Sequence, residues 1–275
     1  MGAVEQAQDQ HVQLVSPPGF MISRGSLAPR RRAGPVSPSY AMICEMDDQT
    51  QPRIAAIVPM RHFSRRVAGK NYRLLGDKPL YRYIVDTLLS VPAITEVVVD
   101  TDSEPIMREI EEDLPRVRLV IRPEHLRSEM QVMNEILLNT VTQVDADYYL
   151  QTHSTGPLLR PDTIGRAIAQ FLESRETHDS LFSVTPLHTR LWTADGRALN
   201  HDPDHLIRTQ DLDPVMEENS CIYIFRRDVL ESRQNRIGAH PLIFIIDPAE
   251  ALDIDTELDW QIAEAALKLA ESAAA

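Results

Sequence analysis

The chain has 275 residues and a formal net charge of -13, with 43% hydrophobic and 25% charged residues. This acidic balance argues against general nucleic-acid binding, and the apolar runs are too short to span a bilayer, so we expect neither nucleic acid nor membrane as a partner. Two cysteines cannot form a disulfide framework, and a reducing cytoplasm is therefore the expected location.

The first 50 residues differ from the rest of the chain. Prolines and three consecutive arginines at 30–32 occur among Ser, Gly and Gln, without a regular apolar period. We interpret residues 1–50 as a disordered extension rich in Pro and Arg. A transit peptide is one alternative, and a true start at Met42 is another.

From residue 53 onward, strand-like and helix-like patterns alternate, which predicts a three-layer α/β fold. Strands are expected at residues 54–59, 96–100, 117–122, 148–151, 180–184, 221–225 and 242–246. Helices are expected at residues 80–89, 104–114 with Ser103 as cap, 130–144, 161–175 and 256–270. We expect residues 148–151 to form a central strand and the irregular region 187–213 to cover a substrate pocket.

A cluster of cations follows the first predicted strand. In order, the loop contains Arg61, Ser64, Arg65, Arg66, Gly69, Lys70 and Asn71. Open α/β sheets bind ligands at the carboxyl ends of their strands, so this loop indicates an anionic ligand, most simply a polyphosphate. A solvated basic loop is the alternative. The glycine patterns of P-loops and dinucleotide-binding folds are absent, which argues against kinases, GTPases and ordinary dehydrogenases.

Two carboxylates lie close together near the end of the chain. Asp253 and Asp255 are spaced i and i+2, so on an extended segment they project to the same side. That geometry suits one hard divalent cation, and magnesium prefers few carboxylates together with substrate phosphates. The alternative is that Asp255 or Thr256 simply caps the following helix.

Polar residues follow the predicted central strand, in the run Gln151, Thr152, His153, Ser154 and Thr155. Such a run indicates either ligand contact or a hydrogen-bonded turn. A general-base role is one interpretation of its histidine, and a structural role is the other.

Three weaker signals lie elsewhere. Arg208, near Gln210, Glu218 and Asn219, could hold an anionic second substrate, or it could form a surface ion pair. Arg122 and Asn134 could line a nucleotide site.

Six segments occur in the order and spacing of the motifs of one enzyme family. The family loop P-A-R-G-G-S-K-x-x-P-x-K-N is similar to residues 59–71, G-K-P-L to 76–80, V-V-S-T-D to 98–102, R-P-x-x-L to 122–126 and x-E-N-G-x-I-Y-I-F to 218–225; D-I-D-T-E-L-D matches 253–259 letter for letter. Together they resemble the acylneuraminate and ketodeoxyoctonate cytidylyltransferases. Two departures stand out: His62-Phe63 replaces the double glycine, and the family's Q-P-T-S-P-L is lengthened to residues 151–158.

The resemblance implies a Rossmann-like α/β/α sandwich of the nucleotide-diphosphosugar transferase type, with a mostly parallel mixed sheet, over residues 51–275. It implies a homodimeric enzyme that transfers CMP from CTP to an acidic acceptor such as a sialic-type sugar acid, with release of pyrophosphate. Three alternatives stay open: a CTP:phosphonate cytidylyltransferase, a non-catalytic nucleotide-binding module, and a nucleotidyltransferase for another base.

The predicted site residues fall into four groups. The catalytic group is Arg61, Lys70, Asp253 and Asp255. The nucleotide-binding group is Arg61, Ser64, Arg65, Lys70, Asn71, Arg122, Asn134 and Gln151, with Arg65 standing where the family has lysine. The acceptor-binding group is His153, Ser154, Thr155, Arg208, Gln210, Glu218 and Asn219. The predicted Mg²⁺ ligands are Asp253 and Asp255.

Overall fold

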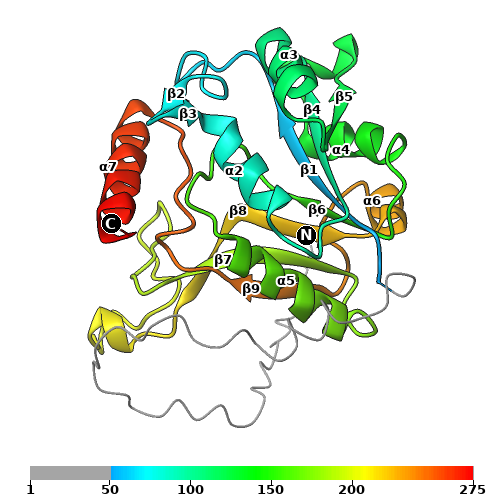
Figure 1. The fold of residues 1–275 in the computed structure, drawn as a ribbon. Helices are drawn as coiled ribbons and strands as arrows, with labels where there is room; N and C mark the ends of the chain where they lie inside the picture. The colour runs from blue at the N-terminus through cyan, green and yellow to red at the C-terminus, as the bar shows by residue number, and fades with distance from the viewer. Residues whose placement is uncertain (1–50, 275) are drawn as a thin grey trace, which may run out of the picture. The chain divides into compact units, whose positions relative to one another are not determined.

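The computed structural model describes residues 51–274 (Figure 1). The predictions for residues 1–50, including the disordered extension, the transit peptide and the start at Met42, lie outside the described residues. Among the described residues, no helix is both long enough and apolar enough to cross a lipid bilayer.

A seven-stranded sheet forms the centre of the fold. In spatial order its strands are β5 (Val117–Ile121), β4 (Glu96–Thr101), β1 (Ile54–Met60), β6 (Tyr148–Gln151), β8 (Val215–Phe225), β7 (Ser180–Leu187) and β9 (Pro241–Ile245). Only β8 runs antiparallel to its neighbours in this sheet. The predicted mixed, mostly parallel sheet is confirmed, with β6 in the middle. All seven residues of β1 are buried, as expected for a strand covered on both faces.

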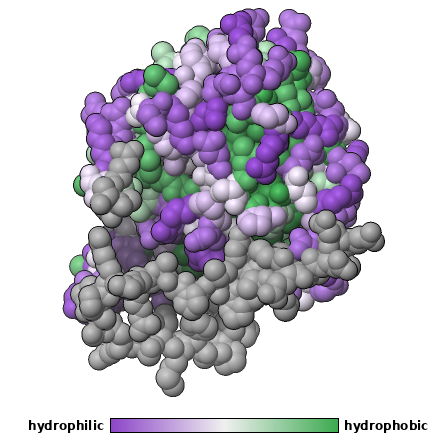
Figure 2. Space-filling model, in the orientation of Figure 1, coloured by the Kyte–Doolittle hydropathy of each residue, from purple (hydrophilic) through white to green (hydrophobic). Residues whose placement is uncertain are grey.

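Helices cover both faces of this sheet. On one side lie α2 (Leu80–Leu89), α3 (Glu104–Asp113) and α5 (Pro161–Ser174); on the other lie α4 (Met133–Val141) and α6 (Arg227–Arg233). The buried hydrophobic residues form one core cluster on each side of the sheet. Ile84, Ile106 and Ile164 belong to the first cluster, whereas Leu137 and Leu230 belong to the second. The predicted three layers are confirmed (Figure 1). In the same orientation, the coloured surface is largely hydrophilic, with apolar residues showing in strips between polar ones (Figure 2).

A third, smaller core joins the segment after β1 to the C-terminal helix. It packs the C-terminal helix α7 (Glu257–Ala274) against the two-stranded hairpin β2 (Leu74–Leu75) and β3 (Lys78–Pro79). Trp260 and Ala263 of α7 contact the cluster that contains Leu75 and Leu80. Figure 1 shows α7 beside this hairpin. The apolar contact therefore holds the segment that precedes α7 near the loop that follows β1.

Several boundaries differ from the predictions. Helix α4 begins later than predicted because residues 128–131 form a turn ahead of it, and it ends at Val141 instead of residue 144. Strand β8 begins six residues earlier than predicted and contains Ser220 at a positive φ of 58°. Helix α6 and the β2–β3 hairpin were not predicted. Ser103 stands at the N-cap of α3 but makes no cap hydrogen bond; its hydroxyl lies 3.0 Å from His62 Nδ1 instead.

Candidate active site

The loop after β1 is fixed by its own hydrogen bonds. Asn71 Nδ2 donates to the carbonyl oxygen of Arg61 at 2.9 Å, while Asn71 Oδ1 accepts from the Ser154 hydroxyl at 2.7 Å. One amide therefore joins the loop to the segment that follows β6. Gly69 has a φ of 63°, and a Cβ there would lie 2.8 Å from the Tyr72 ring. Only glycine fits this position without strain.

The same loop meets the segment before α7. Lys70 Nζ donates to the carbonyl oxygen of Ile254 at 2.7 Å and lies 3.3 Å from Asp255 Oδ1. Arg66 donates to the same Asp255 oxygen at 2.7 Å. The fold thus brings the cationic loop and the paired aspartates together.

Both segments line one cavity of about 650 Å³. Its walls include Arg61, Ser64, Arg65, Arg66, Lys70, Asn71, Arg122, Ser128, Glu129, Gln131, His153, Ser154, Thr155, Asp253 and Asp255. The volume is within the range of small-molecule sites. Cations and hydroxyls therefore face two carboxylates across a space that a nucleotide can enter.

The two aspartates have different surroundings. Asp255 is not the helix cap, because Thr256 Oγ1 accepts from the backbone N–H of Asp259, and Asp259 Oδ2 accepts from the N–H of Thr256. These reciprocal bonds make Thr256 the cap, which leaves the Asp255 side chain free to face the cavity. Within residues 51–274 the Asp253 carboxylate has no hydrogen-bond or ion-pair partner.

Asp253 and Asp255 can supply only some of the ligands that a magnesium ion needs. Among residues 51–274 no group of three or more His, Cys, Asp or Glu side chains could hold a metal. Two carboxylates leave most positions around an octahedral ion for water and phosphate oxygens, which is how Mg²⁺ is usually held beside nucleotides. Asp253 and Asp255 could therefore hold this ion together with a nucleotide.

The strand-end segment after β6 contributes unequally. His153, Ser154 and Thr155 line the cavity, whereas Gln151 is fully buried outside its lining. Gln151 Nε2 donates to the carbonyl oxygen of Thr152 at 2.9 Å, and its Oε1 has no partner among the described residues. Burial, helped by the nearby Arg236 guanidinium, lowers the pKa of His153 to about 4. The imidazole is thus neutral at physiological pH and is a weak base.

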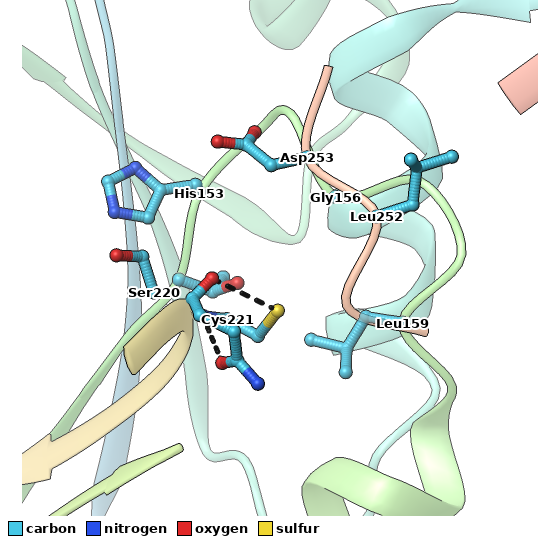
Figure 3. A pocket seen from close by; sticks show the side chains of 9 residues that line it. His153, Gly156, Leu159, Ser220, Cys221, Leu252 and Asp253 are labelled. Carbon is cyan, nitrogen blue, oxygen red and sulfur yellow. Dashed lines mark hydrogen bonds between the residues drawn. The ribbon is translucent and has the colours of Figure 1, made fainter. Parts of the chain in front are cut away.

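A small pocket of about 10 Å³ shares His153 and Asp253 with the large cavity. Figure 3 shows Asp253, from the segment before α7, and His153, from the segment after β6, across from Ser220 and Cys221 of β8. The space suffices for about one water molecule. Burial raises the pKa of the Cys221 thiol to about 12, which makes it unsuited to act as a nucleophile.

A second cavity of about 370 Å³ also shares Asp253. Glu217, Glu218 and Asn219 line it. The Asn219 amide is occupied by structural bonds: Oδ1 accepts from the Ser183 hydroxyl at 2.6 Å and Nδ2 donates to Thr185 Oγ1 at 2.9 Å. Glu218 accepts from the Tyr223 hydroxyl. Glu218 and Asn219, two of the predicted acceptor-binding residues, thus line a cavity that shares Asp253 with the first cavity.

Three predicted site residues do not line these cavities. Arg208 is exposed and pairs with Asp211 at 2.7 Å, which is the surface ion pair given as the alternative. Gln210 is exposed on the same short turn. Asn134 Oδ1 accepts from the backbone N–H of Arg236 at 3.3 Å and does not line them. The structure gives their predicted ligand contacts no support.

Arg122 lines the cavity, and a buried carboxylate on the side away from the cavity fixes its guanidinium. Its Nε donates to Asp100 Oδ1 at 2.7 Å, and both side chains are buried. The other Asp100 oxygen accepts from the Thr140 hydroxyl at 2.6 Å. The residue therefore belongs to a buried network as well as to the cavity wall.

Sequence reasoning left several lining residues unassigned. Arg66 was recognised as part of the cationic loop but not as a site residue. Ser128, Glu129 and Gln131 come from the turn before α4, and Glu129 pairs with Arg65 at 3.3 Å. Their only signal was proximity to the R-P-x-x-L segment.

A family model described as Cytidylyltransferase matches residues 55–273. The chain belongs to the cytidylyltransferase family. It is 28% identical over 236 residues to a CMP-N,N'-diacetyllegionaminic acid synthase of Legionella pneumophila, covering 80% of this chain and 99% of the relative. It is 24% identical to N-acylneuraminate cytidylyltransferase A of Danio rerio, covering 77% of this chain and 50% of that protein.

The solved structures support the fold. A CMP:2-keto-3-deoxy-manno-octonic acid synthetase complexed with CTP aligns with a TM-score of 0.61 at 16% identity, covering 79% of this chain and 99% of that one. The predicted family, fold and enzyme class are confirmed. The phosphonate and binding-module alternatives are not favoured by these similarities.

Proposed function

We propose that this cytidylyltransferase transfers CMP from CTP to a nonulosonic sugar acid. The observation that carries the proposal is the shared cavity in which Lys70 and its neighbouring arginines face Asp253 and Asp255. An acceptor oxygen attacks the α-phosphorus and forms the new P–O bond. The bond from that phosphorus to its bridging oxygen breaks, pyrophosphate leaves with the electron pair, and the acceptor proton passes to solvent.

The cationic loop binds the triphosphate in this proposal. Lys70, Arg61 and Arg65 offset its negative charge, and Ser64 offers a hydroxyl donor. Asn71 acts by holding the loop to Ser154, because both ends of its amide are already bonded. Phosphoryl transfer depends mainly on positioning and charge neutralisation, so a site without a nucleophilic side chain is sufficient.

Magnesium is part of the proposal. Asp253 and Asp255 would hold it, and when bound it would polarise the phosphoryl oxygens and offset the charge of the leaving pyrophosphate. The Asp253 carboxylate, which has no ion-pair partner among residues 51–274, supports this role, since an uncompensated carboxylate beside a cavity attracts a cation.

The acceptor occupies the second cavity. The legionaminic and neuraminic acids in the relatives' names are hydroxyl- and amide-bearing sugars, and the lining carboxylates of Glu217, Glu218 and Asp253 accept hydrogen bonds from such groups. Among the described residues no cationic side chain lines this cavity, so the acid's own carboxylate would have to lie outside it. The names of the relatives favour a sugar acid over the phosphonate alternative.

A homodimer and a cytoplasmic location complete the proposal. Ile243 and Ile245 are exposed on the edge strand β9, and an apolar edge of this kind is compatible with a partner surface. Sedimentation of the full chain would test the dimer.

The proposal is tested by turnover. The full chain is mixed with CTP, Mg²⁺ and one acid at a time (legionaminic, pseudaminic, neuraminic, ketodeoxyoctonic or a phosphonate), while pyrophosphate release is followed and CMP adducts are detected by mass spectrometry. We expect a CMP-nonulosonate product. Asp253→Asn should reduce turnover by about 100-fold or more.

The matched control is Asp247→Asn, which makes the same change at an exposed aspartate outside these cavities. It should leave turnover within about twofold of the original rate. CTP binding without turnover on any acid would identify a binding module instead, and a product with the phosphonate alone would identify the other alternative.

A further inference from the structure

Arg66 pairs with a carboxylate that the proposed magnesium site needs. Its guanidinium donates to Asp255 Oδ1 at 2.7 Å, and Lys70 Nζ lies 3.3 Å from the same oxygen. Asp253 has no such partner within residues 51–274. One carboxylate of the pair is thus neutralised by two cations, while the other has no cationic partner among the described residues.

Of the two cations, Arg66 is the one that can move. The Lys70 side chain is 13% exposed and is anchored to the carbonyl oxygen of Ile254, whereas the Arg66 side chain is 65% exposed. Its only hydrogen bond among the described residues is the one to Asp255. An exposed ion pair of this kind is weak, so a stronger anion can displace it.

The stronger anion would enter the same cavity. Arg66 lines the 650 Å³ space together with Arg61, Arg65 and Lys70. A triphosphate carries several negative charges there, against one on Asp255, and a guanidinium binds phosphate oxygens through two parallel hydrogen bonds. The family loop quoted above leaves this position unspecified (the first x of K-x-x-P), so the resemblance assigns Arg66 no role.

We propose that Arg66 is a further triphosphate-binding residue that occupies Asp255 in the nucleotide-free enzyme and exchanges it for phosphate when nucleotide binds. The inference rests on the proposed function, since it assumes that a nucleoside triphosphate and a divalent cation share this cavity. Arg66 then couples the two ligands: a cation alone competes with the guanidinium for Asp255, and nucleotide removes that competition. Each ligand consequently increases the affinity for the other.

The test measures cation binding without any reaction. Mn²⁺ serves as the probe, and its binding to the full chain is followed by electron paramagnetic resonance with and without CTP, in the absence of acceptor and with correction for the free Mn²⁺–CTP complex. Arg66→Gln should bind Mn²⁺ alone about fivefold more tightly than the original chain, because the competing charge is gone. The same variant should bind CTP about tenfold more weakly.

The matched control is Arg65→Gln, the same charge change one residue earlier. Arg65 pairs with Glu129 rather than with an aspartate of the pair. It should also weaken CTP binding, but it should leave the affinity for Mn²⁺ alone within about twofold. Tighter Mn²⁺ binding together with weaker CTP binding is thus expected for Arg66→Gln alone. A general loss of positive charge from the loop would change both affinities in the same way in Arg65→Gln and Arg66→Gln.

Each outcome has a separate meaning. Equal Mn²⁺ affinities of Arg66→Gln and the original chain would overturn the inference, as would unchanged CTP affinity in that variant. If the original chain does not bind CTP, the proposed function is wrong, and the inference that rests on it is wrong as well. Because Arg66 is exposed, we expect both variants to fold; thermal melting checks this, and Arg66→Lys, which keeps the charge, should restore part of the coupling.

Discussion

The ammonium of Lys70 donates a hydrogen bond of 2.7 Å to the carbonyl oxygen of Ile254, which lies 184 residues further along the chain. The same ammonium faces Asp255 at 3.3 Å. One nearly buried cation therefore holds the loop after β1 against the segment before α7 and contributes positive charge to the cavity. The fold and the candidate site depend on the same contact.

Replacing Lys70 by Met should affect both properties. We expect kcat/KM for CTP to fall by about 100-fold or more, because a charge-assisted donor to the triphosphate is lost. The free energy of unfolding should fall by about 1 kcal/mol through the lost bond to Ile254. Pyrophosphate-release kinetics and urea denaturation measure the two effects.

Lys78→Met is the control for that experiment. Lys78 pairs with Asp86 at 2.6 Å and lies 4.4 Å above the Tyr83 ring, away from the cavity lining. Its replacement should leave KM for CTP within about twofold. Equal losses of kcat/KM in the two variants would contradict a specific role for Lys70.

Arg122→Ala should destabilise the fold more than it weakens nucleotide binding. Among the described residues, the substitution leaves the buried Asp100 carboxylate with the Thr140 hydroxyl as its one side-chain partner. Removing one member of a buried ion pair costs about 3–5 kcal/mol. Denaturant titration should show this loss, and Asp100→Leu combined with Arg122→Leu should recover much of it. A raised KM for CTP at unchanged stability would instead support the nucleotide contact predicted from the sequence.

The sequence was informative where residues adjacent in the chain act together. D-I-D-T-E-L-D contains both the aspartate pair and the Thr256 cap, so one segment supplied a correct helix start and a correct cavity wall. Arg208 and Asn134 carried no such local signal, and their positions depend on how distant segments pack. The seven-residue α6 was missed because it spans only about two turns, too few to show a helical period.

Arg208→Ala should be nearly silent. The side chain is exposed, and its pair with Asp211 at 2.7 Å is of the solvent-screened kind that contributes little to stability. We expect the free energy of unfolding to stay the same within the error of urea denaturation and KM for the acceptor to change by less than about twofold. A tenfold rise in acceptor KM, measured over a range of sugar-acid concentrations, would show that region 187–213 closes over the bound acceptor and would restore the sequence-based hypothesis.

The neutral His153 predicts a pH dependence of stability. Its pKa is about 4 in the folded protein, chiefly because burial disfavours the charged imidazolium, and about 6.5 in an unfolded chain. Between these values the unfolded state binds more protons, so the free energy of unfolding rises with pH from about 4 to about 6.5 and this contribution is constant above. The full effect is roughly 2 kcal/mol, allowing for the partial exposure of the ring.

His153→Gln should remove that slope, which urea titrations of the metal-free protein at pH 4.5, 5.5, 6.5 and 7.5 would reveal as a smaller difference between the first and last curves. The control is His240→Gln, since His240 is exposed and its ring has no partner among the described residues. In this control variant, the free energy of unfolding should depend on pH as it does in the original chain. An unchanged slope in His153→Gln would mean that the imidazole takes up a proton without cost in the folded state, and the histidine would then become available as a charged group at the cavity wall.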